Sequence, residues 1–209
     1  MSFHRPLTFS VVFFIALCQG QVKFDNSPIL IRDVLRKGGV SGAIIYSDKC
    51  RPTSIPVPPH VHPPQKAGTT VEVLQDMFSR DSMMEVTQDS GGIVRMAEKG
   101  VQIDILQVKI HHIKFDTDHA AFQGPNMAMM SILSSPEIQS FEREHHIAPI
   151  LSRLEGSMGQ GLPAVTGELN DVSLAEALDY VLKTFPGYWL YENCTADDGR
   201  RSVHFWFYD

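Results

Sequence analysis

Histidine and aspartate side chains gather in one short stretch of this sequence, and both kinds of side chain can bind a metal ion. Imidazole nitrogens and carboxylate oxygens are ligands that zinc and iron accept in proteins. Neighbouring residues of a strand point to opposite faces, so the two adjacent histidines bind one ion only where the strand is interrupted. A metal site and a group of solvated side chains are therefore the two interpretations. The stretch contains His111, His112, Asp116, Asp118 and His119.

Aromatic residues near the end of the sequence form its densest apolar cluster. Alternate side chains of a strand face the core and the others face outward. If the outward rings are exposed, they form an apolar surface patch suited to binding a protein partner. Core filling is the alternative interpretation, and it accounts for about half of the rings. The candidate partner-binding residues are Tyr188, Trp189, Tyr191 and Trp206.

The first twenty residues are typical of a secretory signal peptide. The apolar run from Leu7 to Leu17 is too short to span the roughly 30 Å hydrocarbon core of a bilayer. We expect cleavage after Gly20 and a periplasmic or extracellular mature chain without a membrane span. A buried N-terminal strand is one alternative. A lipoprotein anchored through Cys18 is another, although Leu17 is larger than the residue that a bacterial lipobox requires before the cysteine.

Two of the three cysteines remain after this cleavage, and they are candidates for one disulfide. These two residues are Cys50 and Cys194. A compartment outside the cytoplasm favours oxidation of the pair. Two unrelated free thiols are the alternative. Because the sequence has no Cys-x-x-Cys pair and no Cys/His zinc spacing, we expect no structural zinc site.

Composition narrows the classes of function. The chain has 209 residues, of which 43% are hydrophobic, and its net charge is −6. Removal of residues 1–20 takes away one arginine and no acid, which changes the net charge to −7. This acidity, without any block of lysine or arginine, argues against a nucleic acid or an anionic membrane as partner. The sequence also lacks the nucleophile elbow of hydrolases and the glycine-rich phosphate loops of nucleotide-binding proteins.

Local patterns predict the elements that must position these residues. Ser27-Pro28 begins a helix that Gly38-Gly39 ends, and a strand follows over 40–47. Alternation of apolar and polar residues predicts a further strand over 101–111, with a bulge at Leu106. Pro149 is expected to begin a helix. The expected organisation is a signal peptide (1–20), an N-terminal helix and strand (21–50), a proline-rich linker (51–66), a first α+β unit (67–125), a helical connector (126–161) and a second α+β unit (162–209).

The second α+β unit repeats the pattern of the first. Thr69–Glu72 and Ser173–Glu176 are both capping boxes, and the second begins 104 residues after the first. Each box opens an apolar helical stripe, and each stripe is followed by two strands joined by an Asp/Gly turn. The repeat indicates either a duplication or simply the general frequency of helix-then-hairpin units. The predicted fold class is α+β, with two helix-plus-antiparallel-hairpin units and a helical middle segment.

The second unit also resembles a known domain family. Its segments Asn170-Asp-Val-Ser-Leu-Ala-Glu-Ala-Leu, Tyr188-Trp-Leu-Tyr-Glu and Val203-His-Phe-Trp-Phe are similar to the short N-terminal domain shared by bacterial secretins and TonB-dependent receptors. The likeness covers residues 162–209, and a weaker copy covers 69–111. It implies a small β-α-β-β interaction module of the cell envelope, without catalysis, and it implies neither a pore nor a receptor.

The sequence therefore favours an exported, non-catalytic interaction protein with a protein partner in the cell envelope and no cofactor. Two alternatives stay open. The first is a metal-dependent enzyme or metal-binding protein that uses the cluster at 111–119. The second is a protein that binds a small ligand, for which the sequence indicates no site.

Overall fold

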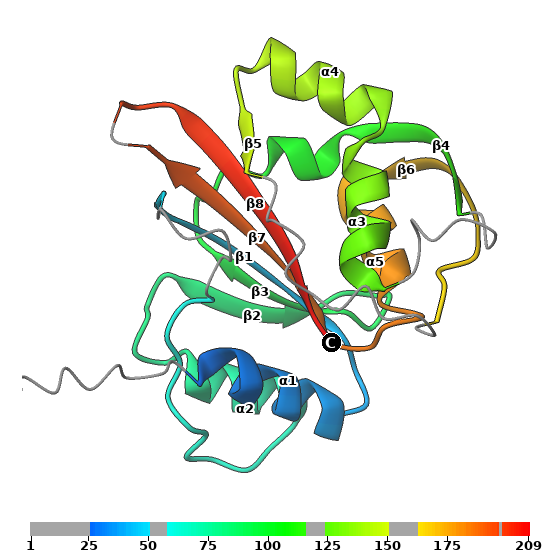
Figure 1. The fold of residues 1–209 in the computed structure, drawn as a ribbon. Helices are drawn as coiled ribbons and strands as arrows, with labels where there is room; N and C mark the ends of the chain where they lie inside the picture. The colour runs from blue at the N-terminus through cyan, green and yellow to red at the C-terminus, as the bar shows by residue number, and fades with distance from the viewer. Residues whose placement is uncertain (1–25, 51–57, 116–123, 151–162, 197) are drawn as a thin grey trace, which may run out of the picture.

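The computed structural model describes residues 26–50, 58–115, 124–150, 163–196 and 198–209, which form a mixed sheet with helices on both faces (Figure 1). The signal peptide predicted for residues 1–20 lies outside this described part. The helices are α1 (Ser27–Lys37), α2 (Thr70–Met77), α3 (Pro125–Leu133), α4 (Pro136–Glu144) and α5 (Leu174–Val181), with a 3-10 helix, η1, over Asp104–Gln107. No helix among the described residues is long and apolar enough to cross a membrane.

A six-stranded sheet runs through the molecule in the order β2-β3-β1-β7-β8-β5, and a second sheet pairs β4 with β6. The central strand β1 runs parallel to both β3 and β7, while β2–β3 and β7–β8 are antiparallel hairpins. The mixed α+β fold class is therefore confirmed. The strands are β1 (Gly42–Lys49), β2 (Met84–Gln88), β3 (Val94–Glu98), β4 (Lys109–Phe115), β5 (Ala148–Ile150), β6 (Gly167–Ser173), β7 (Tyr188–Thr195) and β8 (Arg201–Tyr208).

The two helix-plus-hairpin units share this one sheet. Strand β1 pairs with the second strand of the first hairpin, β3, but with the first strand of the second hairpin, β7. The two hairpins are thus not placed equivalently around β1. Helices α1 and α2 cover one face of the sheet, whereas α5 and α3 lie on the other face (Figure 1).

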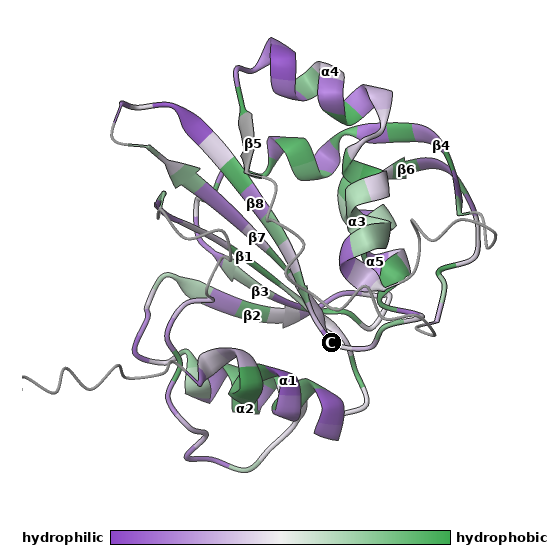
Figure 2. Ribbon diagram, viewed as in Figure 1, coloured by the Kyte–Doolittle hydropathy of each residue, from purple (hydrophilic) through white to green (hydrophobic). Residues whose placement is uncertain are grey.

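Each face of the sheet has its own hydrophobic core. Ile44 and Leu190 pack with α1 and α2, while Trp189 and Tyr191 pack with α3 and α5. Because successive side chains of a strand alternate in direction, each central strand contributes to both cores. The cores are therefore divided by sheet face and not by sequence unit. Figure 2 shows mostly apolar residues along α3 and many polar residues along α4.

Both predicted capping boxes are confirmed. The Ser173 hydroxyl accepts a hydrogen bond from the Glu176 amide at 3.2 Å, and the Glu176 carboxylate accepts one from the Ser173 amide at 2.6 Å. The bond from the Ser173 amide lowers the pKa of Glu176. Thr69 and Glu72 form the same reciprocal pair at the start of α2. These bonds satisfy backbone donors that the first turn of a helix leaves unpaired.

We expect Ser173→Ala to lower the free energy of unfolding by about 1 kcal/mol, because the Glu176 amide loses its acceptor. Ser173→Asp should retain most of the stability, since a carboxylate also caps an N-terminus. Urea denaturation followed by circular dichroism measures both values. Equal stability of the alanine variant and the wild type would show that solvent replaces the cap.

Two predicted elements are wrong. The stretch expected as one strand over 101–111 contains η1, and β4 begins only at Lys109. Adjacent Ile105 and Leu106 are both buried in the same core, which a helical turn allows, whereas neighbouring side chains of a strand point to opposite faces. Pro149 lies within the strand β5 and does not begin a helix. This strand is at the edge of the sheet, where the missing amide of a proline is tolerated.

The described part of the proline-rich linker, from residue 58, has no regular secondary structure. It packs against the hydrophobic core that α1 and α2 cover. The Val61 side chain is buried, and its amide donates to the Ser27 hydroxyl at 3.0 Å. The His62 ring bonds to the Pro63 carbonyl oxygen and to the Ser79 hydroxyl. This segment therefore holds α1 against α2 as an extended strap.

Candidate functional site

The structure does not bring the predicted metal ligands together in its described part. His111 bonds to Asp171 at 2.9 Å, while His112 bonds to a different carboxylate, Glu168, also at 2.9 Å. The hydrogen bond with Asp171 raises the pKa of His111. No group of three or more histidine, cysteine, aspartate or glutamate side chains among the described residues has a geometry that could hold a metal ion. The other three candidates, Asp116, Asp118 and His119, lie outside the described residues.

The four aromatic candidates for partner binding are buried, which corrects the expectation of an exposed face. Tyr188 and Tyr191 are 0% exposed, Trp189 is 1% exposed and Trp206 is 8% exposed. The Trp189 indole donates to Asp179, and the Tyr191 hydroxyl donates to the Gln102 carbonyl, so these polar ends are satisfied inside the protein. The expectation was wrong because it assumed that helices cover only one face of the β7–β8 hairpin, whereas helices cover both faces.

Cys50 and Cys194 form a disulfide with an S–S distance of 2.11 Å. The bond joins the ends of β1 and β7, which are parallel neighbours at the centre of the sheet. The Cys50 amide also donates to the Thr195 carbonyl at 3.2 Å, which continues the pairing of these strands past β1. The sequence left open a disulfide or two free thiols, and the structure contains the disulfide.

Two buried or half-buried arginines are fully engaged in structural ion pairs. Arg95 of β3 bonds to Asp89 in the β2–β3 turn and to Asp179 on α5. Arg201 of β8 bonds to Asp104 of η1. Burial raises the pKa of Asp104, but the hydrogen bonds from Arg201 and from neighbouring groups outweigh it, and the net shift is downward. These two arginines hold α5 and η1 to the sheet, so neither is a candidate for binding a ligand.

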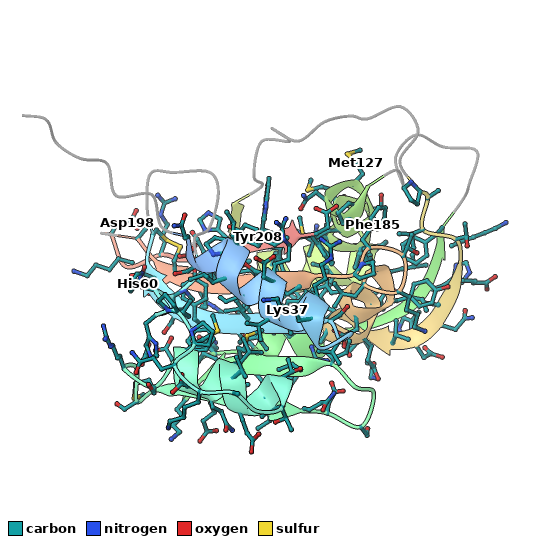
Figure 3. The ribbon with its side chains drawn as sticks, turned by 90° about the horizontal axis from the view of Figure 1, so that it is seen from below. Lys37, His60, Met127, Phe185, Asp198 and Tyr208 are labelled. Carbon is teal, nitrogen blue, oxygen red and sulfur yellow. A yellow bond between two sulfur atoms is a disulfide. The ribbon has the colours of Figure 1, made fainter. Side chains whose placement is uncertain are left out.

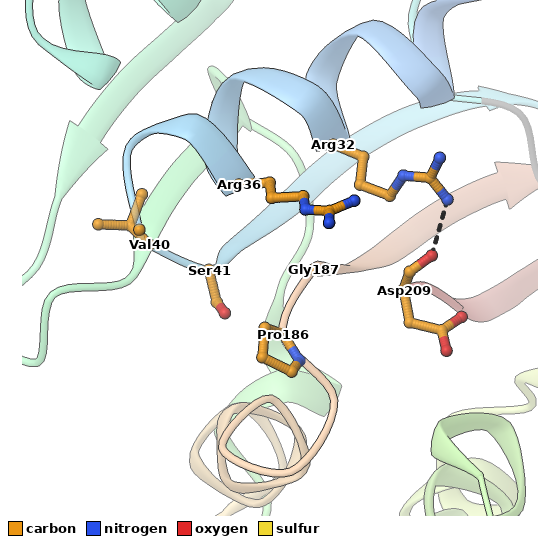
Figure 4. Close-up of a pocket in the computed structure, with 8 residues that line it drawn as sticks. Arg32, Arg36, Val40, Ser41, Pro186, Gly187 and Asp209 are labelled. Carbon is orange, nitrogen blue, oxygen red and sulfur yellow. Dashed lines mark hydrogen bonds between the residues drawn. The ribbon is translucent and has the colours of Figure 1, made fainter. Parts of the chain in front are cut away.

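A cleft lies where the end of α1 meets the start of β7 (Figure 4). We call it the arginine cleft, because Arg32 and Arg36 line it from successive turns of α1. The cavity has a volume of about 610 Å³. Pro186 and Gly187 form the opposite wall, and Asp209 lies at the end beside Arg32.

Local backbone geometry fixes both walls of the arginine cleft. Helix α1 stops at Gly38, and Gly39 has a φ of 65°, which favours glycine. On the other side, a Cβ on Gly187 would come within 2.1 Å of the Tyr208 carbonyl oxygen, so only glycine fits there. The Gly42 amide donates to the Gly187 carbonyl at 2.9 Å and ties the two walls together.

The two arginines of the cleft differ in their partners. The Arg32 guanidinium donates to the main-chain oxygen of Asp209 at 2.8 Å. The Arg36 guanidinium makes no hydrogen bond or ion pair with any residue that the structure describes. Figure 4 shows it directed into the cleft, between Arg32 and the Pro186–Gly187 wall. A free guanidinium is a planar donor suited to bidentate binding of an oxyanion.

This cleft has almost no signature in the amino-acid sequence, and the sequence predicted no site there. The only local signal is the spacing of Arg32 and Arg36, four residues apart just before the Gly38–Gly39 stop. Such a pair on the outer side of a helix is common and by itself indicates a solvated surface. The opposite wall lies about 150 residues further along the chain, and no sequence pattern connects the two.

A second feature that the sequence did not predict is a buried hydrogen bond between a carboxyl group and an imidazole across β7 and β8. Glu192 and His204 bond through Oε2 and Nδ1 at 2.5 Å, and each residue is 1% exposed. The remaining atoms, Glu192 Oε1 and His204 Nε2, have no hydrogen-bond partner among the described residues. Glu192 lies on the same face of β7 as the core residues Tyr188 and Leu190, because alternate residues of a strand share a face. This spacing is the signal in the sequence that Glu192 is buried. Neither side chain lines the arginine cleft.

Comparison of this chain with models of protein families, with curated proteins and with solved structures finds no match.

Proposed function

We propose that this chain is an exported, non-catalytic interaction protein that binds an acidic segment of a protein partner in the arginine cleft. The observation that carries the proposal is the Arg36 guanidinium, which lines a cavity without a partner among the described residues. Arg36 is exposed, so its planar N–H donors are open to an anion that a partner supplies. The cleft therefore favours a negatively charged ligand, although the chain as a whole is acidic.

Two further observations support the remaining parts of the proposal. The disulfide between Cys50 and Cys194 is typical of an oxidising compartment such as the periplasm or the extracellular space. Elements β6, α5, β7 and β8 follow one another in the β-α-β-β order that the resemblance to the secretin and TonB short N-terminal domain implies. That family resemblance supports an interaction role in the cell envelope.

The volume of the cleft favours one second candidate, a protein that binds a small carboxylate. Cavities that hold small molecules measure roughly 300–1,000 Å³, and the arginine cleft is within this range at about 610 Å³. The metal-binding alternative has no comparable observation among the described residues and is not proposed.

A charge-matched pair of variants tests the proposal. Arg36 and Lys37 are adjacent, exposed cations at the end of α1, but only Arg36 lines the cleft (Figures 3 and 4). We expect Arg36→Glu to weaken binding of a hexaglutamate peptide at least about tenfold, because it replaces the binding cation with a repelling anion. Lys37→Glu makes the same change in net charge and should weaken binding less than about threefold, because screened surface charges contribute little.

Titration of the ¹⁵N-labelled chain (residues 21–209) by NMR measures these affinities and locates the peptide. Shifts should centre on the amides of Val40, Ser41 and Gly187, and hexaglutamine should cause none. Equal losses in the two variants would show non-specific charge attraction and refute the cleft as the site. Binding of glutarate, together with failure of the peptide, would support the small-ligand candidate in place of a protein partner.

A further inference from the structure

We infer that the acidic segment bound by the arginine cleft belongs to a second copy of this chain. The segment runs from Asp81 to Glu85 and leads from α2 into β2, and we call it the acidic ridge. This inference rests on the proposed function and names its partner. Three observations support it: the shape of the ridge, its position in the sheet and its match to the cleft in charge and polarity.

The acidic ridge stands between two hollows of the surface. Asp81 and Met84 line both a cavity of about 490 Å³ beside α2 and a cavity of about 270 Å³ beside the end of β1. A segment that separates two hollows projects from the surface, and its shape is then complementary to a cleft. The arginine cleft, at about 610 Å³, is larger than either hollow.

The ridge and the cleft lie at opposite ends of the same sheet. Gly42, which follows the cleft residue Ser41 at the start of β1, pairs with Val94, the first residue of β3. Met84 of the ridge pairs with Glu98, the last residue of β3. One copy therefore cannot place its own ridge in its own cleft, so a contact between the two surfaces joins two copies head to tail.

An exposed methionine distinguishes the ridge from other acidic segments of the surface. Met83 is 47% exposed, and only Ile29 and Ile103 are comparably exposed large hydrophobic residues in the described part of the chain. Ile103 adjoins Asp104, whose carboxylate is already bonded to Arg201. Ile29 lies on α1, the helix that carries the arginines of the cleft. Of these three residues, Met83 thus combines best with an acidic group that is open to a partner.

The lining of the cleft matches the ridge in both charge and polarity. Val40 and Pro186 provide apolar surface for Met83, whose unbranched side chain adapts to irregular gaps (Figure 4). Asp81 Oδ1 accepts a hydrogen bond from the Met83 amide at 3.0 Å, and Asp81 Oδ2 has no partner among the described residues. This carboxylate oxygen is an acceptor for the Arg36 guanidinium of the second copy.

Association through one ridge and one cleft is expected to be weak and reversible. The ridge is a single short segment, so its contact area falls well below the roughly 800 Å² per partner of a standard stable interface. The acidic net charge of the chain also opposes the approach of two copies. Since the ends of each assembly retain a free ridge and a free cleft, oligomers should lengthen with protein concentration instead of stopping at a dimer.

Exchange of charges between ridge and cleft tests the inference by sedimentation velocity on the chain (residues 21–209). The weight-average sedimentation coefficient of the wild type should rise with protein concentration. Arg36→Glu and Asp81→Lys each bring like charges together, so each should weaken association about tenfold. An equimolar mixture of the two variants should recover association, because the reversed cleft of one variant then meets the reversed ridge of the other.

Matched variants separate this contact from general charge attraction. Lys37→Glu has the same net charge as Arg36→Glu but should associate as the wild type does. Asp81→Asn retains an acceptor for the Met83 amide, so it removes the charge while it keeps the local turn, and it should also weaken association. Met83→Ser should weaken association about fivefold, because less apolar surface is buried, whereas Ile103→Ser should leave it unchanged.

A wild type that remains monomeric up to about 1 mM would overturn the inference. Association that both Arg36→Glu and Asp81→Asn leave unchanged, or a mixture of folded Arg36→Glu and Asp81→Lys that stays monomeric, would also overturn it. If the chain is monomeric while hexaglutamate binds in a manner that depends on Arg36, the inference fails and the proposed function stands. If neither a second copy nor the peptide binds through Arg36, both fail.

Discussion

Removal of the disulfide between Cys50 and Cys194 is expected to lower the free energy of unfolding by about 4 to 5 kcal/mol. The bond closes a loop with a sequence separation of 144 residues, so it removes much conformational entropy from the unfolded chain. It also lies at the end of β1, the central strand on which both hairpins depend. A loss of this size is a large part of the stability of a typical domain.

The double variant Cys50→Ala/Cys194→Ala measures this effect in urea denaturation. Alanine suits the buried site of Cys194 better than serine, because it adds no unpaired hydroxyl. Treatment of the wild type with a reductant should reproduce the loss, while the same treatment should leave the variant unchanged. A difference below about 1 kcal/mol would contradict the entropic argument and show that the unfolded chain is already compact.

Replacement of either Glu192 or His204 alone by leucine is expected to cost about 3 to 5 kcal/mol. Each single change leaves the other polar group buried without its partner, and both residues are almost completely inaccessible to solvent. The pair is also incompletely satisfied, because Glu192 Oε1 and His204 Nε2 have no hydrogen-bond partner in the part of the chain that the structure describes. The desolvation of two polar groups is thus only partly offset by the single bond between them.

The double variant Glu192→Leu/His204→Leu should therefore be at least as stable as the wild type, within about 1 kcal/mol, since no polar group remains unpaired. A double-mutant cycle from urea denaturation gives the coupling energy directly. The retained oligomeric state of each variant, checked by size-exclusion chromatography, serves as the control for misfolding. If the two single losses simply add in the double variant, the residues act through packing and not as a pair.

The features that the sequence predicted correctly are those set by residues close together in the chain. Both capping boxes depend on a hydroxyl and a carboxylate three residues apart, and their hydrogen bonds close within one turn. The end of α1 at Gly38 and the two antiparallel hairpins follow from similarly local geometry. Local hydrogen bonds and backbone preferences need no other part of the chain, and they survive in almost any tertiary arrangement.

The error about the aromatic residues has a physical cause, which is the burial of both faces of one sheet. Alternation in strand β7 is visible in the sequence, but both of its faces are covered by helices from different parts of the chain. Trp189, which the alternation alone allows at the surface, therefore lies in a core. The strand predicted over 101–111 was wrong for a different reason. The adjacent apolar residues Ile105 and Leu106 are both buried in a 3-10 turn, and this turn depends on the packing of η1 against α5, which no local pattern shows.

The amino-acid sequence alone determined the caps of α2 and α5, the end of α1 and the two antiparallel hairpins, because these depend on neighbours within a few residues. Only the tertiary structure decided that the two helix-plus-hairpin units share a sheet, that Cys50 meets Cys194, and that Arg36 faces Pro186 across a cleft. Each of these contacts joins residues well over a hundred positions apart. Such contacts exist only after strands have paired in one particular order, and that order depends on the summed burial of the whole chain instead of on any local pattern.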